Sequence, residues 1–230
     1  MHVPGRPSLF FLFFLLALMP WMAIRSAQRV RTIGTAALPK RSASLIGTMF
    51  NLAILLFLSV MAGRDFGYPF FATPRVDARS IVAAIVALAA CFGLRAISQS
   101  IRSEDERRKM FVYQLAPRTA KEWALWTITV LIAGVAEEVA YRGVGMSILT
   151  YAVGNPWLAA LICAIAFAVA HAVQGWKSGV IIFAIALVAH ALVAFTGTLV
   201  YAIVVHIIYD LAAGYLISRE AERRAMVPSS

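Results

Sequence analysis

Cysteine, acidic residues and long polar stretches are all scarce in this chain of 230 residues. Cys91 and Cys163 are its two cysteines, and both lie inside apolar runs without a CxxC partner. This pattern argues against a disulfide framework and predicts two small buried hydrophobic residues. Two protease signatures are also missing, because the chain contains neither H-E-x-x-H nor G-x-S-x-G. The function therefore has to be sought in other patterns.

Apolar sequence is abundant: 61% of the residues are hydrophobic and the mean hydropathy is +0.80. Such a composition predicts an all-α, polytopic membrane helix bundle. The formal net charge is +10, but the cations fall mostly between apolar runs rather than along one polar stripe. This distribution predicts contact with the lipid bilayer and argues against nucleic acid as a partner.

Seven apolar runs have about the length needed to cross a bilayer as helices. Basic loops 25–41 and 98–121 and the basic tail would then lie on one side of the membrane. An eighth element, short or re-entrant, is possible at Val144–Val153, so we expect seven or eight transmembrane helices. The seven runs are Leu9–Ile24, Leu45–Ala62, Ile81–Ile97, Trp123–Tyr141, Trp157–Val173, Val180–Phe195 and Thr198–Ile217.

The first run has two interpretations. Its flanks, Arg6 before it and Arg25-Ser26-Ala27 after it, are compatible with a signal peptide. The dense basic residues that follow resist translocation, and so favour an uncleaved first helix with its N-terminus outside. Arginine far outnumbers lysine and alanine is abundant, as in bacteria with GC-rich codons. We therefore expect a multi-pass protein of the bacterial cytoplasmic membrane.

The first of three polar clusters within the last four apolar segments is Glu137-Glu138-x-x-x-Arg142. An ionised side chain at membrane depth costs about 2.5–3.5 kcal/mol on insertion scales, and usually faces a protein interior where it has a function. Glu138 and Arg142 are i,i+4 neighbours and can form an ion pair. Glu137 points about 100° away and can face a cavity. The alternative is that both acids simply lock helices together by pairing with cations.

The other two clusters are Phe167-Ala-Val-Ala-His171 and His206-Ile-Ile-Tyr-Asp210, each with i,i+4 spacing. Taken alone, each could be a satisfied interior histidine or a structural His–Asp hydrogen bond. His190 has no polar neighbour at helical spacing and is interpreted as an interior packing or hydrogen-bonding residue. Acids and histidines on three successive helices are nevertheless typical of one converging site.

Together these three clusters resemble the CAAX protease and bacteriocin-processing family of intramembrane endopeptidases, also called the ABI family. The family pattern is E-E-x-x-x-R, then F-x-x-x-H, then H-x-x-x-N or D, on separate transmembrane helices. The resemblance covers roughly Glu122 to Leu216. It implies a division into N-terminal transmembrane helices with basic loops (1–121), a catalytic core (122–217) and a charged tail (218–230).

The resemblance also implies a role for each motif residue. Glu137 would activate a water molecule that His171 helps to hold or deprotonate. His206 and Asp210 would stabilise the oxyanion of the tetrahedral intermediate. Glu138 would share in catalysis by supporting this geometry with Arg142 and Phe167. The substrate would be a membrane-associated or secreted peptide or protein, processed at its C-terminus, and no cofactor would be required.

One residue departs from the pattern of the prenyl-protein proteases, which usually carry Asn where this chain has Asp210. An aspartate donates a hydrogen bond only when it is protonated, so Asp210 can instead orient His206. A prenylated substrate is not assumed, since a bacterium is not expected to farnesylate proteins.

Three other functions compete with a glutamate-activated protease. Zinc held by Glu137, His171, His206 and Asp210 would make the chain a metalloprotease with nitrogen and oxygen ligands. A non-catalytic immunity or scaffold protein could keep the same fold. Intramembrane acids and histidines also serve as proton relays in transporters, but no repeat or pair of broken helices supports that function here.

Overall fold

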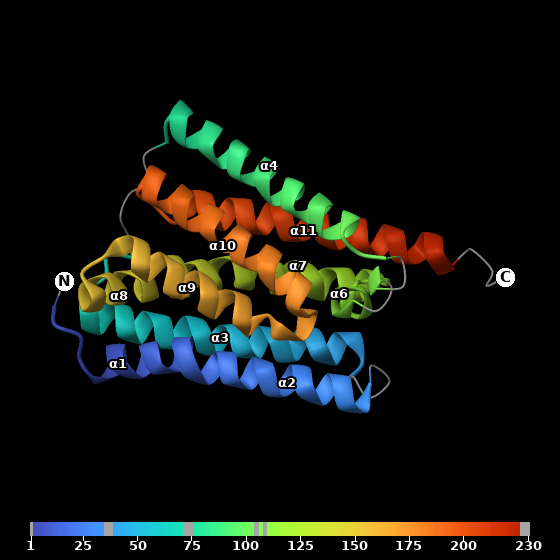
Figure 1. Ribbon diagram of the computed structural model, residues 1–230, viewed down its shortest axis with the longest axis horizontal. Helices are drawn as coiled ribbons and strands as arrows, with labels where there is room; N and C mark the ends of the chain where they lie inside the picture. The colour runs from blue at the N-terminus through green and yellow to red at the C-terminus, as the bar shows by residue number, and fades with distance from the viewer. Residues whose placement is uncertain (1, 35–38, 71–75, 104–105, 108–109, 226–230) are drawn as a thin grey trace.

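The computed structural model describes residues 2–34, 39–70, 76–103, 106–107 and 110–225, and within them the protein is all-α (Figure 1). In chain order the helices are α1 (Arg6–Phe13), η1 (Phe14–Leu18), α2 (Met19–Ile33), α3 (Arg41–Phe66), α4 (Ala78–Ser100), α6 (Phe111–Leu115), α7 (Ala120–Glu137), η3 (Glu138–Gly145), α8 (Met146–Val153), α9 (Pro156–Ala170), η4 (Ala172–Gln174), α10 (Trp176–Thr196) and α11 (Val200–Ala225). Residues 226–230 of the predicted tail lie outside this description.

Six helices of the described chain are long and apolar enough to cross a membrane, and a seventh apolar helix is shorter. This is the pattern of a multi-pass membrane protein, as the hydropathy predicts. The six are Arg6–Ile33, Arg41–Phe66, Ala78–Ser100, Ala120–Val153, Trp176–Thr196 and Val200–Arg223, and the shorter helix is Pro156–Ala170.

The possible eighth element at Val144–Val153 is not a separate span. Helices α7, η3 and α8 follow one another without a break, so this segment continues the helix that begins at Ala120. The physical reason is that Gly143 and Gly145 do not end the helix, since neither has a positive φ. Glu137 consequently lies near the middle of a 34-residue helix rather than at the end of a short one.

The first apolar run also belongs to a longer helix than its hydropathy suggests, because α2 continues through the basic residues to Ile33. Pro20 lies just inside α2, after the π-helical segment η1. A proline ring clashes with the carbonyl four residues earlier in a regular α-helix. The wider π-helical turn accommodates this clash while the helix continues.

Local capping residues set the ends of the helices that carry the site. Helix α7 begins at a capping box. The Thr119 side chain accepts a hydrogen bond from the Glu122 backbone N–H, and the Glu122 side chain accepts one from the Thr119 backbone N–H. Helix α9 begins with Pro156 after the N-cap residue Asn155, whose side chain accepts from two backbone N–H groups. Helix α10 ends at Gly197, which adopts a left-handed backbone conformation.

The helices alternate in direction along the long axis of the bundle (Figure 1). The C-terminal ends of α2, α4 and α11 and the first residues of α7 and α10 lie at one end, on the right in the figure. The N-terminus lies at the opposite end. We call the right-hand end the basic end, since the cationic segments 25–34 and 218–225 and the described parts of 98–121 are attached there.

The largest apolar core joins the two halves of the chain. Phe11, Leu15 and Phe66 from the first half are completely buried against Val144 and Cys163 from the second. Burying a large apolar side chain contributes about 1.5–3 kcal/mol, so this shared core fixes the position of the C-terminal helices. Cys91 and Cys163 are both buried, as their apolar context predicts.

Candidate active site

The two glutamates lie where the α-helical turn gives way to a π-helical one. Glu137 is the last residue of α7, and Glu138 opens η3, in which every residue is buried. π-helical segments are rare and frequently occur at functional sites. A Cβ on Gly145 would lie 2.5 Å from the backbone oxygen of Ala140, so this position requires glycine. The sequence analysis assumed a regular helix here and missed the π-helical segment.

Glu138 is held on two sides. Its Oε1 accepts a hydrogen bond from Arg142 Nη1 at 3.2 Å, which is the ion pair that the i,i+4 spacing predicts. The same oxygen accepts a second hydrogen bond from His206 Nδ1 at 2.8 Å. Arg142 in turn lies over the Phe167 ring, 4.4 Å from its centroid. Glu138 therefore links η3 to α11 directly and to α9 through Arg142, and its bond to His206 was not foreseen from the sequence.

His206 is the residue around which the acids gather. While Nδ1 donates to Glu138, the opposite ring nitrogen, Nε2, lies 3.4 Å from Asp210 Oδ2 and 3.7 Å from Glu137 Oε2. Glu137 has a side chain that is 16% exposed, against 2% for Glu138. The structure thus brings together both glutamates, His206 and Asp210, and leaves Glu137 as the more accessible glutamate.

His171 is placed by its own helix. It follows the last residue of α9, and its Nδ1 lies 2.8 Å from the backbone oxygen of Phe167. A carbonyl oxygen only accepts, so Nδ1 carries the proton and donates it, which leaves Nε2 with a free lone pair when the ring is neutral. The His171 ring also packs on the Phe167 ring at a centroid distance of 4.6 Å. Among the described residues, no direct hydrogen bond or ion pair joins His171 to Glu137.

All seven residues singled out in the sequence line one cavity of about 580 Å³. Ligand cavities commonly have volumes of about 300–1,000 Å³, so this one can hold a short peptide segment. Its wall also contains polar residues that the sequence analysis did not select, namely Asn51, Arg95, Gln99, Tyr141 and Tyr209. The sequence could have indicated these residues, because each is a polar side chain inside or beside an apolar run.

Several polar atoms around this cavity are buried without a protein partner. Among the residues that line it, they are Gln99 Oε1, Trp126 Nε1, Glu138 Oε2, Tyr141 OH and Arg142 Nε. His190 is buried, as expected of an interior residue. Buried polar atoms of this kind are usually satisfied by ordered water. The polar wall therefore suits a reaction that needs water at membrane depth.

The site does not present a ready set of metal ligands. In the described part of the chain, no group of three His, Cys, Asp or Glu side chains is placed to hold a metal ion. The His206 nitrogen that bonds Glu138 would also be unavailable as a ligand. The geometry thus gives no support to a zinc site at Glu137, His171, His206 and Asp210.

In a comparison with protein families, residues 119–212 match the family model described as type II CAAX prenyl endopeptidase Rce1-like. The matched segment runs from the N-cap of α7 into α11, and contains all seven residues described above. Comparisons with curated proteins and with solved structures give no match.

Proposed function

We propose that this chain, whose residues 119–212 are a type II CAAX prenyl endopeptidase Rce1-like domain, is an intramembrane endopeptidase that uses a glutamate-activated water. The domain implies a protease with a peptide substrate and membrane association. The observation that carries the finer proposal is the asymmetry of the two glutamates. Glu138 is fixed by Arg142 and His206, while Glu137 faces the cavity and is the acid left to act on water.

In the first step, Glu137 takes a proton from a water molecule as the water oxygen attacks the peptide carbonyl. Nε2 of His171 accepts the second hydrogen bond of that water and orients it, since its Nδ1 is engaged by the Phe167 carbonyl. A bond forms between the water oxygen and the carbonyl carbon, and the carbonyl oxygen becomes an oxyanion. A positioned base of this kind accelerates a reaction about 10²–10⁴-fold.

His206 stabilises the oxyanion. Its Nδ1 donates to Glu138, and its Nε2 lies beside the carboxylates of Glu137 and Asp210. In this step the ring is protonated on both nitrogens, and the single Nε2–H is shared between Asp210, which orients the ring, and the developing oxyanion. The intermediate then collapses, the C–N bond breaks, and Glu137 returns its proton to the leaving amine.

The proposed substrate is a membrane-associated or secreted peptide or protein that is cleaved near its C-terminus. The cavity lies among the membrane-spanning helices, and both apolar and polar residues line it.

The direct test is cleavage of membrane-associated peptides by the purified protein in lipid vesicles, with prenylated and unprenylated versions of each peptide. Mass spectrometry of the products should show a new C-terminus with wild type and none with Glu137→Gln. A chelator should leave the rate unchanged. Loss of activity to the chelator with recovery on adding zinc would favour a metalloprotease, and equal products from both proteins would contradict the role of Glu137.

A further inference from the structure

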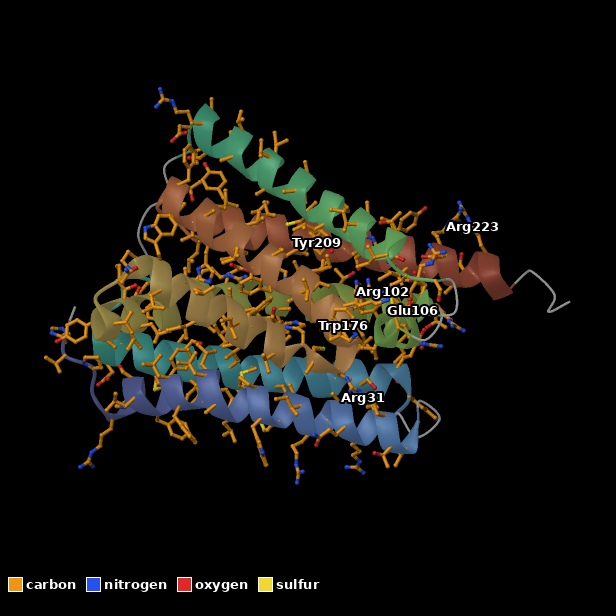
Figure 2. All side chains as sticks on the ribbon, viewed as in Figure 1. Arg31, Arg102, Glu106, Trp176, Tyr209 and Arg223 are labelled. Carbon is orange, nitrogen blue, oxygen red and sulfur yellow. The ribbon has the colours of Figure 1, made fainter. Side chains whose placement is uncertain are left out.

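A second cavity, of about 510 Å³, lies at the basic end of the bundle. Its wall is formed by the end of α2, the segment that follows α4, and the chain from Val173 to the start of α10. Figure 2 shows Arg102, Glu106 and Trp176 at this end, with Arg31 on the neighbouring helix. We call this cavity the basic pocket.

Three cations line the basic pocket against a single carboxylate among the described residues. The cations are Arg31, Arg102 and Lys177, and the carboxylate is Glu106, whose Oε1 lies 2.7 Å from Lys177 Nζ. One acid cannot neutralise three cations, so the described lining of the pocket carries a net positive charge. An anionic group bound there would restore the balance.

Arg102 is the least exposed of the three cations, with 7% of its surface accessible. Its guanidinium is positioned by uncharged groups, since Nη2 donates to Ser178 Oγ at 3.0 Å and Nη1 donates to Ser98. Within the described part of the chain, no carboxylate forms an ion pair with Arg102. Glu106 attracts Arg102 without forming an ion pair with it, so the buried guanidinium is only partly compensated, which makes this position suited to binding an anion.

The surroundings of the pocket are those of a membrane interface. Trp176, on its rim, is 73% exposed, and tryptophan is enriched where the bilayer meets water. Exposed apolar side chains lie within three residues of the pocket residues in sequence, at Ile33, Ile101 and Val180. A ligand that carries both an anionic group and acyl chains would match the basic pocket and these apolar neighbours at the same time.

We propose that the basic pocket binds the headgroup of an anionic phospholipid. Basic pockets between transmembrane helices at the cytoplasmic side are suited to such headgroups, and each cation near the membrane surface contributes about 1 kcal/mol. The backbone N–H groups at the start of α10 add a partial positive charge. The phosphate lies between Arg102 and Lys177, and the acyl chains extend along the exposed apolar residues.

The basic pocket adjoins the catalytic cavity. Met110, Val173 and Gln174 line both, and Val173 is two residues after His171. A headgroup in the basic pocket would therefore hold the segment that connects His171 to α10. Lipid binding should be detectable as slower hydrogen exchange in this segment, whether or not the protein cleaves peptides.

The test is native mass spectrometry of the full chain in neutral detergent with added phosphatidylglycerol or phosphatidylcholine. Wild type should retain phosphatidylglycerol in preference to phosphatidylcholine. Arg31→Gln and Lys177→Gln should each weaken retention about fivefold, which is the equivalent of one surface cation. Glu106→Gln should strengthen retention about fivefold because it removes the only described carboxylate of the pocket. Hydrogen exchange of residues 171–178 should slow with phosphatidylglycerol in wild type and not in Lys177→Gln.

Arg29→Gln is the matched control for Arg31→Gln, since Arg29 is an exposed cation of α2 that does not line the pocket. This variant should retain lipid like wild type. Glu137→Gln should also retain lipid, which separates this proposal from the proteolytic one. Equal retention of phosphatidylcholine, or unchanged retention in both Arg31→Gln and Lys177→Gln, would overturn the proposal. Full displacement of the lipid by inorganic phosphate would show that the pocket binds a free anion, and would overturn it as well.

Discussion

Glu137 and Glu138 are adjacent in the sequence, but their surroundings are different. Glu138 accepts hydrogen bonds from Arg142 and His206 and is almost completely buried. Glu137 lines the cavity, and its one ion-pair contact among the described residues is with His206 Nε2 at 3.7 Å. A group that is bonded on two sides contributes to stability, whereas a group that faces a cavity is available for chemistry.

Substituting each glutamate by glutamine should separate these roles. Glu138→Gln leaves the buried Arg142 without a counterion, so we expect a loss of about 3 kcal/mol in the free energy of unfolding. Glu137→Gln should leave the melting temperature nearly unchanged while peptide cleavage falls at least about 100-fold. Thermal unfolding and product formation should be measured on the same preparations. A large drop in melting temperature for Glu137→Gln would contradict this division.

Asp210 offers a second test, because the related prenyl-protein proteases usually have asparagine at this position. The Asp210 carboxylate lies 3.4 Å from His206 Nε2, a distance that suits orientation of the ring. Asparagine keeps an oxygen for this contact and adds a donor for the oxyanion, so Asp210→Asn should retain activity within about tenfold. Asp210→Ala keeps neither the oxygen nor a donor, and its kcat should fall about 100-fold, as for the loss of one oxyanion-site contact. Equal losses in kcat for the two variants would contradict the orienting role.

At the scale of the helix, η3 determines how the site residues are presented. A Cβ added at Gly145 would lie 2.5 Å from the backbone oxygen of Ala140, five residues earlier in the helix. It would also lie 2.7 Å from Leu15 Cδ2. The first contact is with backbone, which cannot move away as a flexible side chain can. Gly145 therefore permits both the π-helical turn and the close packing of the first helix against it.

Gly145→Ala should consequently destabilise the protein by about 2 kcal/mol, as overpacking does, and should lower kcat because it displaces Glu138 and Arg142. Gly179→Ala is the control: this glycine lies inside α10, and an added Cβ meets no atom within 4 Å. The control should keep full activity and gain up to about 1 kcal/mol in stability. If Gly145→Ala had wild-type melting temperature and kcat, the requirement for glycine in η3 would be wrong.

The sequence predicts the helices well because hydropathy is a local property. Each of the seven expected apolar runs lies largely within a helix of the structure, but Trp157–Val173 extends beyond the end of α9 and Thr198–Ile217 begins two residues before α11. Helix ends were less accurate, since α2 continues through Arg25, Arg29 and Arg31, whose polarity places them at the interface without ending the helix. The π-helical turn could not be predicted from hydropathy, because its hydrogen-bonding pattern leaves no mark on the apolar pattern.

Prediction of the site from the sequence is limited in the same way to local contacts. The Glu138–Arg142 and His206–Asp210 contacts connect residues four positions apart on one helix, and helical spacing predicts both. The Glu138–His206 bond connects residues 68 positions apart, and no periodicity contains that information. Likewise, the placement of His171 beyond the end of α9 depends on how that helix ends.

At the scale of the whole molecule, we propose that the cationic segments at one end of the bundle set its orientation in the membrane. Loops rich in Lys and Arg remain on the cytoplasmic side, so the basic end should face the cytoplasm and the N-terminus should lie outside. This orientation also places the basic pocket on the cytoplasmic side.

Cysteine labelling can determine the orientation with little background, since Cys91 and Cys163 are both buried. Val3 is 76% exposed at the N-terminal end, and Glu222 is exposed on α11 at the basic end. A membrane-impermeant maleimide should label Val3→Cys in intact cells, and should label Glu222→Cys only after the cells are permeabilised. The reverse labelling pattern would contradict the proposed topology.

The central claim is that Glu137 is the base of a peptide-cleaving site within the membrane. Its most direct test is a comparison of membrane-protein C-termini, by mass spectrometry, between cells expressing wild type and cells expressing Glu137→Gln at equal levels. A membrane-associated precursor should accumulate with the variant, and its shortened form should be present with wild type. Identical C-termini throughout the two membrane proteomes would contradict the claim.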